Sequence, residues 1–465
     1  MTWRPRFRFV PNIEWRFQRI LFTGLSSSVV KGLSIVFQTI SVPLILSLYG
    51  QEIFGLFATI YAILNILNFT DLGLGWSLQN ELPSLIRADD WAQINRYVAN
   101  TFFALVGIAA LLLVLLWAFT EVWSVSALFG VTVAPATFDR MFFYAMGWFL
   151  LGIPFSISNR IYSAFQEMYY INLWRLIYWV LTFSILGLTV YYSLAVEQYV
   201  LLERGANFVY FAVGIAALFL TKLHLRLPRL WQIEWSLVST LISGGVKLLV
   251  VQVMFVLLSS IDSVLILRLM SEADAARFAV GMKLVTIAST PIIMFISPII
   301  PAVTDAFINN DRHWITHEFV RRVRWFVLPL LLLPMAYLLC GEFVLELWVG
   351  DTIRLSFLEH LAFALFLPAF ILLVFVYSTM FNKLYAGFLT KQLLLAIGVL
   401  AILKTAAVLL FGRTIPSVVF PTVITILGVL FVPFMLRFHR DRWIMSRAEI
   451  AAARSAVDTS VRPGV

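Results

Sequence analysis

Residues 20–48 read ILFTGLSSSVVKGLSIVFQTISVPLILSL, and this apolar stretch decides the class of the protein. About 20 apolar residues in a helix are enough to cross the ~30 Å hydrocarbon core of a bilayer. The stretch is longer than the apolar core of a signal peptide, and no small-x-small cleavage pattern leads from it into a polar segment. We therefore expect a retained membrane-spanning helix, which carries one lysine, Lys31.

The composition of the whole chain agrees with this expectation. Of its 465 residues, 61% are hydrophobic and 13% are charged, and the mean hydropathy is +0.92, whereas about 25% of the residues of a soluble domain are charged. The apolar runs predict an all-α, polytopic membrane protein with about twelve transmembrane helices. We place them at residues 20–47, 52–84, 97–119, 141–163, 172–195, 200–219, 236–267, 278–304, 326–341, 357–382, 392–412 and 415–436.

The basic residues predict the orientation of these helices. Of the 34 lysines and arginines, 24 lie in the termini and in the loops on the same side of the membrane, whereas the opposite loops hold only Arg140, Arg268, Arg277, Arg354 and Arg413. Because cytoplasmic loops are enriched in basic residues, we expect a multi-pass protein of the cell inner membrane with both termini in the cytoplasm. The formal charge of +9 follows the membrane, so nucleic acid is not expected as a partner.

An internal repeat predicts two lobes of six helices. Leu25-Ser-Ser-Ser-Val-Val-Lys-Gly-Leu33 matches Leu241-Ile-Ser-Gly-Gly-Val-Lys-Leu-Leu249 at five of nine positions, including the lysine. Repeats of this orientation are related by an axis along the membrane normal, and their substrate binds between them. We predict an interfacial N-terminal segment at 1–19, an N-lobe at 20–219, a cytoplasmic linker at 220–235, a C-lobe at 236–436 and a cytoplasmic tail at 437–465.

The two matched lysines, Lys31 and Lys247, lie near the middle of their predicted helices. A lysine at that depth costs at least ~2.5–3.5 kcal/mol, so it is expected to face a wet cavity or a partner. Two such lysines are suited to holding an anion in a central cavity. The alternative is that each lysine pairs with a carboxylate, such as Asp71 or Asp262, purely for structure.

Other polar residues are candidates for the cavity or for a gate. Tyr61, Asn65, Asn68 and Asp71 are spaced by four, three and three residues, which places them on one helix face that either lines water or bonds to another helix. For Asp71 we favour a gate or helix-contact role. Asn159 and Arg160, which follow an expected kink at Pro154, are further candidates. The remaining candidates are Gln38, Asp262 and Lys283. For Arg204, Lys283 and Lys404, snorkelling to the interface is the favoured interpretation.

Several motifs resemble one known family. Tyr49-Gly-Gln-Glu-Ile-Phe-Gly55, Asp71-Leu-Gly-Leu-Gly75, Asp262, Pro301 and Leu347-Trp-Val-Gly350 occur in this order. Over roughly residues 20–440 the chain resembles the polysaccharide transporter branch, which includes the O-antigen flippases, of the multidrug/oligosaccharidyl-lipid/polysaccharide flippase superfamily. It departs from that family at Ala275-Ala-Arg-Phe278, where a glycine would usually stand two residues before the aromatic residue.

The resemblance implies a substrate class. It implies a flippase that moves a polyprenyl-diphosphate-linked oligosaccharide, such as an O-antigen, capsule or exopolysaccharide repeat unit, from the cytoplasmic to the outer leaflet by alternating access. Lys31 and Lys247 would hold the diphosphate, the prenyl tail would stay in lipid, and a glycan polymerase and a chain-length regulator would be partners besides the membrane lipids.

Two other classes of protein fit the sequence less well. A membrane-embedded glycan polymerase or glycosyltransferase usually needs a charged external loop, but residues 120–140 contain only Glu121, Asp139 and Arg140 as charges. A multidrug cation antiporter of the same superfamily should present carboxylates at mid-depth, where this chain has lysines. The sequence therefore predicts a transporter and not an enzyme, without catalytic residues, cofactor or metal site.

Overall fold

The computed structural model describes residues 15–67, 73–243, 261–296, 320–368, 370 and 371, together with residues 399, 402, 403 and 406. The described residues contain helices and loops and no strand. They fall into two compact units, each made of several chain segments. The first unit contains residues 1–44, 68–128 and 134–247, and the second contains residues 45–67, 129–133 and 248–465.

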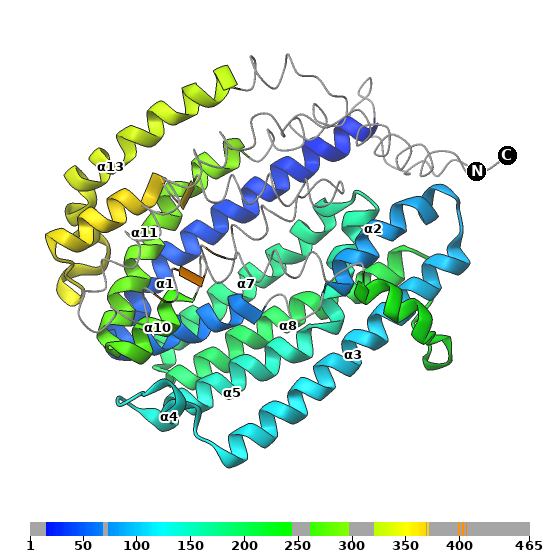
Figure 1. The fold of residues 1–465 in the computed structure, drawn as a ribbon, viewed down its shortest axis with the longest axis horizontal. Helices are drawn as coiled ribbons and strands as arrows, with labels where there is room; N and C mark the ends of the chain where they lie inside the picture. The colour runs from blue at the N-terminus through cyan, green and yellow to red at the C-terminus, as the bar shows by residue number, and fades with distance from the viewer. Residues whose placement is uncertain are drawn as a thin grey trace. The chain divides into compact units, whose positions relative to one another are not determined.

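The first unit is a bundle of helices around a common core. It contains the first part of α1 (Trp15–Leu67) and then α2 (Leu74–Arg87), α3 (Trp91–Val122), α4 (Val125–Phe129), α5 (Pro135–Gly152), α6 (Ile157–Ala164), α7 (Met168–Tyr192) and α8 (Val196–Thr221), with the 3-10 turns η1 (Pro154–Ser156) and η2 (Leu230–Gln232). Helices α5 and α7 both pack along α8 (Figure 1). Trp148 and Phe208 meet there with ring centroids 5.1 Å apart, so aromatic packing stabilises this core.

The second unit joins segments that lie far apart in the sequence. It contains the last part of α1, then α10 (Asp262–Leu269), α11 (Glu272–Ile296), α13 (Val320–Val349), the turn η4 (Gly350–Thr352) and a short helix, Phe357–Pro368. Figure 1 shows α10 and α11 in green and α13 in yellow-green. Phe278 and Phe363 lie with their ring centroids 6.1 Å apart, which packs the helix Phe357–Pro368 on α11.

Several helices have the length and composition of membrane spans. Within the described residues five helices are long and apolar enough to cross a membrane, or six if the bent pair Pro135–Gly152 and Pro154–Ala164 counts as one span. This pair is bent by 45°, so the kink expected at Pro154 is confirmed. Proline removes a backbone N–H and clashes with the preceding turn, which is the physical cause of the bend. The predicted all-α, polytopic fold class is confirmed.

Two predicted helix boundaries differ from the observed ones, whereas the break predicted between the spans 20–47 and 52–84 is observed. Gly50 is non-helical with φ 83°, so it separates the two halves of α1. The span predicted at 52–84 is not one helix, because α1 ends at Leu67 and α2 begins after Gly73, whose φ of 76° favours glycine. The helix predicted from residue 278 begins at Glu272, because the side chain of Ser271 caps it by accepting a 3.1 Å hydrogen bond from Asp274 N.

Candidate functional site

Lys31 lies near the middle of the first half of α1. It stands 16 residues after Trp15 and 18 before Tyr49, which is about 24 and 27 Å along the helix. Its side chain is exposed, and so are the neighbouring Ser28 and Gly32. Lys31 forms no ion pair with a carboxylate of the described residues. The first of the two lysines is therefore an exposed cation within an apolar helix, and its position at mid-depth in the bilayer stays a prediction.

Helix α7 holds this half of α1 in place. The side-chain amide of Asn172 donates hydrogen bonds of 2.9 Å to the hydroxyl oxygens of both Ser26 and Ser27. Farther along, the ring of Phe37 lies 5.4 Å from Trp179 and 5.2 Å from Phe183. These polar and aromatic contacts fix the rotation of α1 about its axis, so the exposed position of Lys31 is set by the packing of its neighbours.

The remaining candidates from the sequence belong to several helices. Gln38, two turns after Lys31, donates a 3.1 Å hydrogen bond to Ser34 Oγ. Asn65 is exposed on the second half of α1, in the second unit. Asp262 is buried at the start of α10, and Lys283 is half-buried on α11. Lys247, Asn68, Asp71 and Lys404 lie outside the described residues, so the predicted convergence of Lys31 and Lys247 stays a prediction.

Asn159 and Arg160 belong to polar contacts of the first unit. The Oδ1 atom of Asn159 accepts a 3.1 Å hydrogen bond from Tyr210 Oη. The guanidinium of Arg175 lies 5.3 Å from the centre of the Tyr210 ring, within the range of a cation–π contact. The guanidinium of Arg160 lies 4.2 Å from the ring of Trp76. Asn159 and Arg160 thus have aromatic neighbours. Within the described residues, neither of them contacts Lys31.

A buried ion pair in α8 was not expected. Arg204 donates a 2.7 Å hydrogen bond to the carboxylate of Glu203, which also accepts one of 2.7 Å from Tyr178 Oη. The Glu203 side chain is 3% exposed and that of Arg204 is 15% exposed. The snorkelling interpretation of Arg204 is therefore replaced by a buried ion pair. The signal in the sequence was an acidic residue directly before a basic one inside an apolar run.

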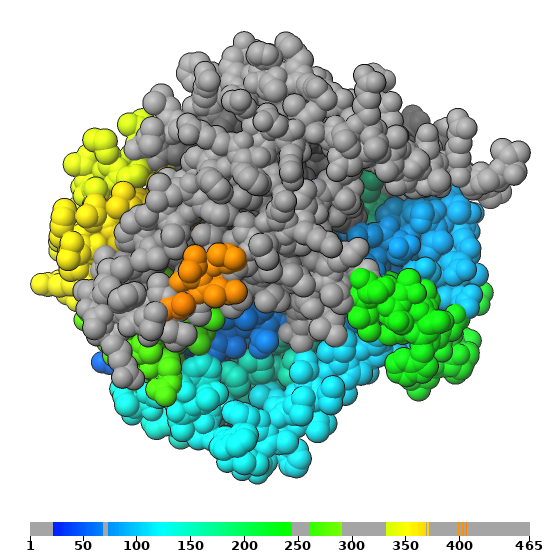
Figure 2. Space-filling model, viewed as in Figure 1, coloured from blue at the N-terminus to red at the C-terminus, as the bar shows by residue number. Residues whose placement is uncertain are grey.

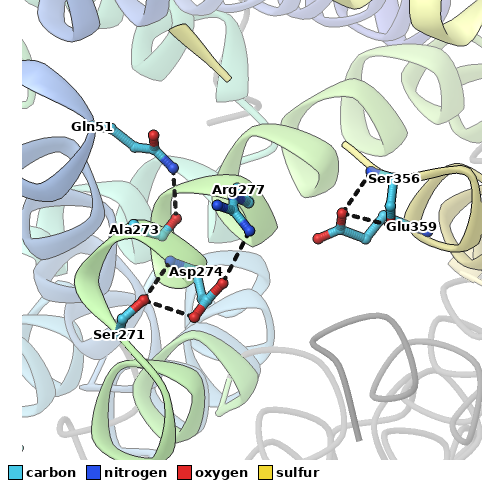
Figure 3. Close-up of polar contacts among 7 residues, drawn as sticks. All are labelled: Gln51, Ser271, Ala273, Asp274, Arg277, Ser356 and Glu359. Atoms are coloured by element: carbon cyan, nitrogen blue, oxygen red, sulfur yellow. Dashed lines mark hydrogen bonds and ion pairs between the residues drawn. The ribbon is translucent and has the colours of Figure 1, made fainter. Parts of the chain in front are cut away.

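The start of α11 is tied to two other segments of the second unit. The carboxylate of Glu272 accepts hydrogen bonds from the backbone N–H groups of Thr132 at 2.7 Å and Val133 at 3.1 Å. Gln51 Nε2 donates a 3.1 Å hydrogen bond to the carbonyl oxygen of Ala273 (Figure 3). We call the contacts of Gln51, Gly55, Thr132 and Val133 with the first residues of α11 the α11 cap. It joins residues from α1, from 129–133 and from α11.

Gly55 allows the second half of α1 to approach α11 closely. A Cβ atom at position 55 would lie 2.0 Å from the carbonyl oxygen of Glu272 and 3.1 Å from the backbone nitrogen of Ala276. Only a glycine fits this contact. Ala275 and Ala276 are also buried, so the small residues at the start of α11 allow the two helices to approach closely. These alanines belong to Ala275-Ala-Arg-Phe278, where the sequence departs from the pattern of the polysaccharide transporter family that it resembles.

Comparisons with known proteins identify the fold. Neither a family model nor a curated protein sequence matches the chain. Among solved structures, the chain is similar to an inward-facing multidrug resistance MATE family transporter of the MOP superfamily, with a TM-score of 0.68, 12% identity and coverage of 95% of this chain and 99% of that chain. It is also similar to the lipid II flippase MurJ in an inward closed conformation, with a TM-score of 0.65, 12% identity and coverage of 90% and 87%.

A third similar structure is a mutant of the Vibrio cholerae MATE transporter VcmN, with a TM-score of 0.57, 15% identity and coverage of 91% and 96%. The similar structures are thus multidrug transporters and a lipid flippase. The chain shares the fold of these transporters, and it is a multi-pass membrane protein.

Proposed function

We propose that this chain is a flippase that carries a polyprenyl-diphosphate-linked oligosaccharide from the cytoplasmic to the outer leaflet of the inner membrane. The observation that supports this function is the exposed side chain of Lys31 within the apolar first half of α1, where we expect mid-depth in the bilayer. A cation there costs at least ~2.5–3.5 kcal/mol in lipid, so a hydrated cavity that receives an anion accounts for it. Lys247, its counterpart in the sequence repeat, is the second cation of the proposed cavity.

The proposed mechanism needs no ion other than the substrate. The lysines hold the diphosphate by charge-assisted hydrogen bonds, while the sugars stay in water and the prenyl tail stays in lipid. A head group of charge near −2 gains ~4.6 kcal/mol on outward transfer across a potential of about 100 mV, negative inside. Alternating access of the lobes then moves the head group, with both termini of the chain in the cytoplasm. A glycan polymerase and a chain-length regulator would receive the product.

A multidrug cation antiporter is the second candidate, because MATE transporters are among the similar structures. Such a site needs a carboxylate that is available to a cation. Glu203 is a carboxylate within a spanning helix of the first unit, but Arg204 neutralises it and Tyr178 hydrogen-bonds to it. Electrostatics therefore favours the anionic substrate.

Reconstituted protein can decide between the two substrates. Proteoliposomes are loaded with a fluorescent polyprenyl-diphosphate oligosaccharide, and a membrane-impermeant reductant measures the fraction in the outer leaflet. A parallel assay follows uptake of ethidium, an organic cation, under a proton or sodium gradient. We expect the protein to move the lipid-linked sugar and not ethidium. Gradient-driven ethidium transport without lipid flipping would establish the antiporter and reject the flippase.

A further inference from the structure

The segment that follows α8 has a fixed conformation on the first unit. The side-chain amide of Asn95 donates a 3.0 Å hydrogen bond to the carbonyl oxygen of His224, and its Oδ1 accepts one of 2.7 Å from Arg226 N. Asn100 does the same one and a half turns later, with bonds of 2.9 Å to Gln232 O and 2.6 Å from Glu234 N. Both asparagines belong to α3, which therefore holds residues 224–234 at two points.

Two ion pairs and one apolar side chain complete this attachment. The ammonium of Lys222 lies 2.7 Å from the carboxylate of Glu167, and both side chains are buried. Arg96 of α3 pairs with Glu234. Leu225 is 5% exposed and packs into the unit. The inner face of the segment is thus satisfied by the protein itself.

The outer face of the same segment is apolar. Five large side chains are each between 67% and 85% exposed; they are Leu223, Leu227, Leu230, Trp231 and Trp235. They lie beyond the last residue of α8, Thr221, at the end of a spanning helix. Figure 2 shows the green segment at the surface beside the blue residues of the first unit. Leaving these side chains in water would cost roughly 25 cal/mol for each Å² of apolar surface.

Two arginines on this face have no carboxylate partner in the described region. Arg226 and Arg229 are exposed, and the guanidinium of Arg229 lies 5.3 Å from the centre of the Trp231 ring. Lys222, Arg96 and their carboxylates neutralise one another, so the remaining charge of the segment is positive. Tryptophan and arginine together are typical of the headgroup layer, where the rings lie at the interface and guanidinium groups bind phosphate.

We propose that residues 223–235 form an in-plane membrane anchor, which inserts Leu227, Leu230 and Trp231 below the headgroups and binds anionic phospholipid through Arg226 and Arg229. The partner is the anionic leaflet, because the exposed face combines apolar side chains at the end of a membrane helix with two arginines that have no carboxylate partner among the described residues. This inference depends on the membrane fold and not on the proposed substrate. The anchor is held to α3 by Asn95 and Asn100, so it fixes that end of the first unit at the bilayer surface.

Spin labels on the full-length protein test the insertion. Cys340, the single cysteine of the sequence, is removed by Cys340→Ser, and a nitroxide is attached after Leu227→Cys or Trp231→Cys. The control is Ala88→Cys, which labels an exposed residue between α2 and α3 in the same unit. In phosphatidylglycerol-containing vesicles we expect the labels at 227 and 231 to collide with oxygen more than with an aqueous nickel chelate, and the label at 88 to show the reverse.

Lipid selection is tested with the double variant Arg226→Gln and Arg229→Gln. Native mass spectrometry of protein released from mixed phosphatidylglycerol and phosphatidylcholine measures the ratio of bound lipids. We expect the ratio to fall by about fivefold for each arginine lost. The control variant Arg140→Gln removes an arginine that is paired with Glu197 and should leave the ratio unchanged. Water-exposed labels at 227 and 231, which would suit a protein partner, or an unchanged ratio in the double variant, would overturn the proposal.

Discussion

The two halves of α1 differ in how their side chains are used. Before Gly50, the helix exposes Lys31 and Gly32, and a Cβ atom at Gly32 would meet nothing within 4 Å. After Gly50, the helix buries Phe54, Leu56 and Ile60, and Gly55 touches the backbone of α11. The second half serves packing, whereas the first half leaves open space around a charge. One helix therefore combines a closely packed part with a part that exposes a charge.

Glu203 and Arg204 of α8 form an ion pair, whereas Lys31 pairs with no carboxylate of the described residues. The change Glu203→Gln keeps the shape of the side chain but removes the buried carboxylate that pairs with the half-buried guanidinium of Arg204. We expect a loss of about 3–5 kcal/mol in the free energy of unfolding, measured by thermal denaturation in detergent. The double variant Glu203→Leu with Arg204→Leu should recover most of that loss. A fully stable Glu203→Gln protein would show that the ion pair is unimportant for the fold.

Gly55→Ala tests the packed half of α1. The new methyl group would lie 2.0 Å from the carbonyl oxygen of Glu272, so α1 or α11 must shift. Overpacking of this kind costs roughly 1–3 kcal/mol, and we expect the melting temperature to fall accordingly. An unchanged melting temperature would contradict the close approach.

Gly32→Ala is the matched change in the open half. Because its Cβ meets nothing within 4 Å, the substitution should cost no packing and should gain up to ~1 kcal/mol from the higher helix propensity of alanine. The measurement is the same thermal denaturation. A loss as large as that of Gly55→Ala would mean that the two halves of α1 are equally packed.

The smallest effect is expected from the pH response of the α11 cap. Burial raises the pKa of the Glu272 carboxyl, but hydrogen bonds from the N–H groups of Thr132 and Val133 outweigh it, so the pKa lies below its ordinary value. The ionised carboxylate of Glu272 therefore stabilises the folded protein at pH values above the ordinary carboxyl pKa. This contribution to the free energy of unfolding is lost as the pH falls through the lowered pKa of the folded state. Unfolding of wild type and Glu272→Gln, compared between pH 7 and pH 3, should converge at the acid end; parallel curves would contradict this.

The sequence predicted the class of this fold and part of its detail. Apolar periodicity indicated the spanning helices, and Pro154 indicated the bend, because both are local effects. The start of α11 was misplaced although Ser271-Glu-Ala-Asp274 has the spacing of a capping box. Gly55 stood in a recognised motif, but its role depends on α11, which is far away in the sequence.

The candidate site was predicted only in part. The expected depth of Lys31 rests on helix length and stays a prediction, and its exposed side chain depends on the packing of Ser26 and Ser27 against Asn172. The ion pair of Glu203 and Arg204 was missed because adjacent residues do not face each other on an ideal helix. The contacts of Asn95 and Asn100 join residues 129 to 134 positions apart, which no local pattern reveals.

Lys31 carries the central claim, and a paired measurement of transport and stability tests it most directly. The flipping of the fluorescent lipid-linked oligosaccharide and the melting temperature are measured for Lys31→Ala, Lys31→Arg and the control Ser28→Ala, an exposed residue one turn away. We expect Lys31→Ala to abolish flipping without lowering the melting temperature, Lys31→Arg to retain more activity, and Ser28→Ala to resemble wild type. Full flipping by Lys31→Ala, alone and combined with Lys247→Ala, would contradict the account.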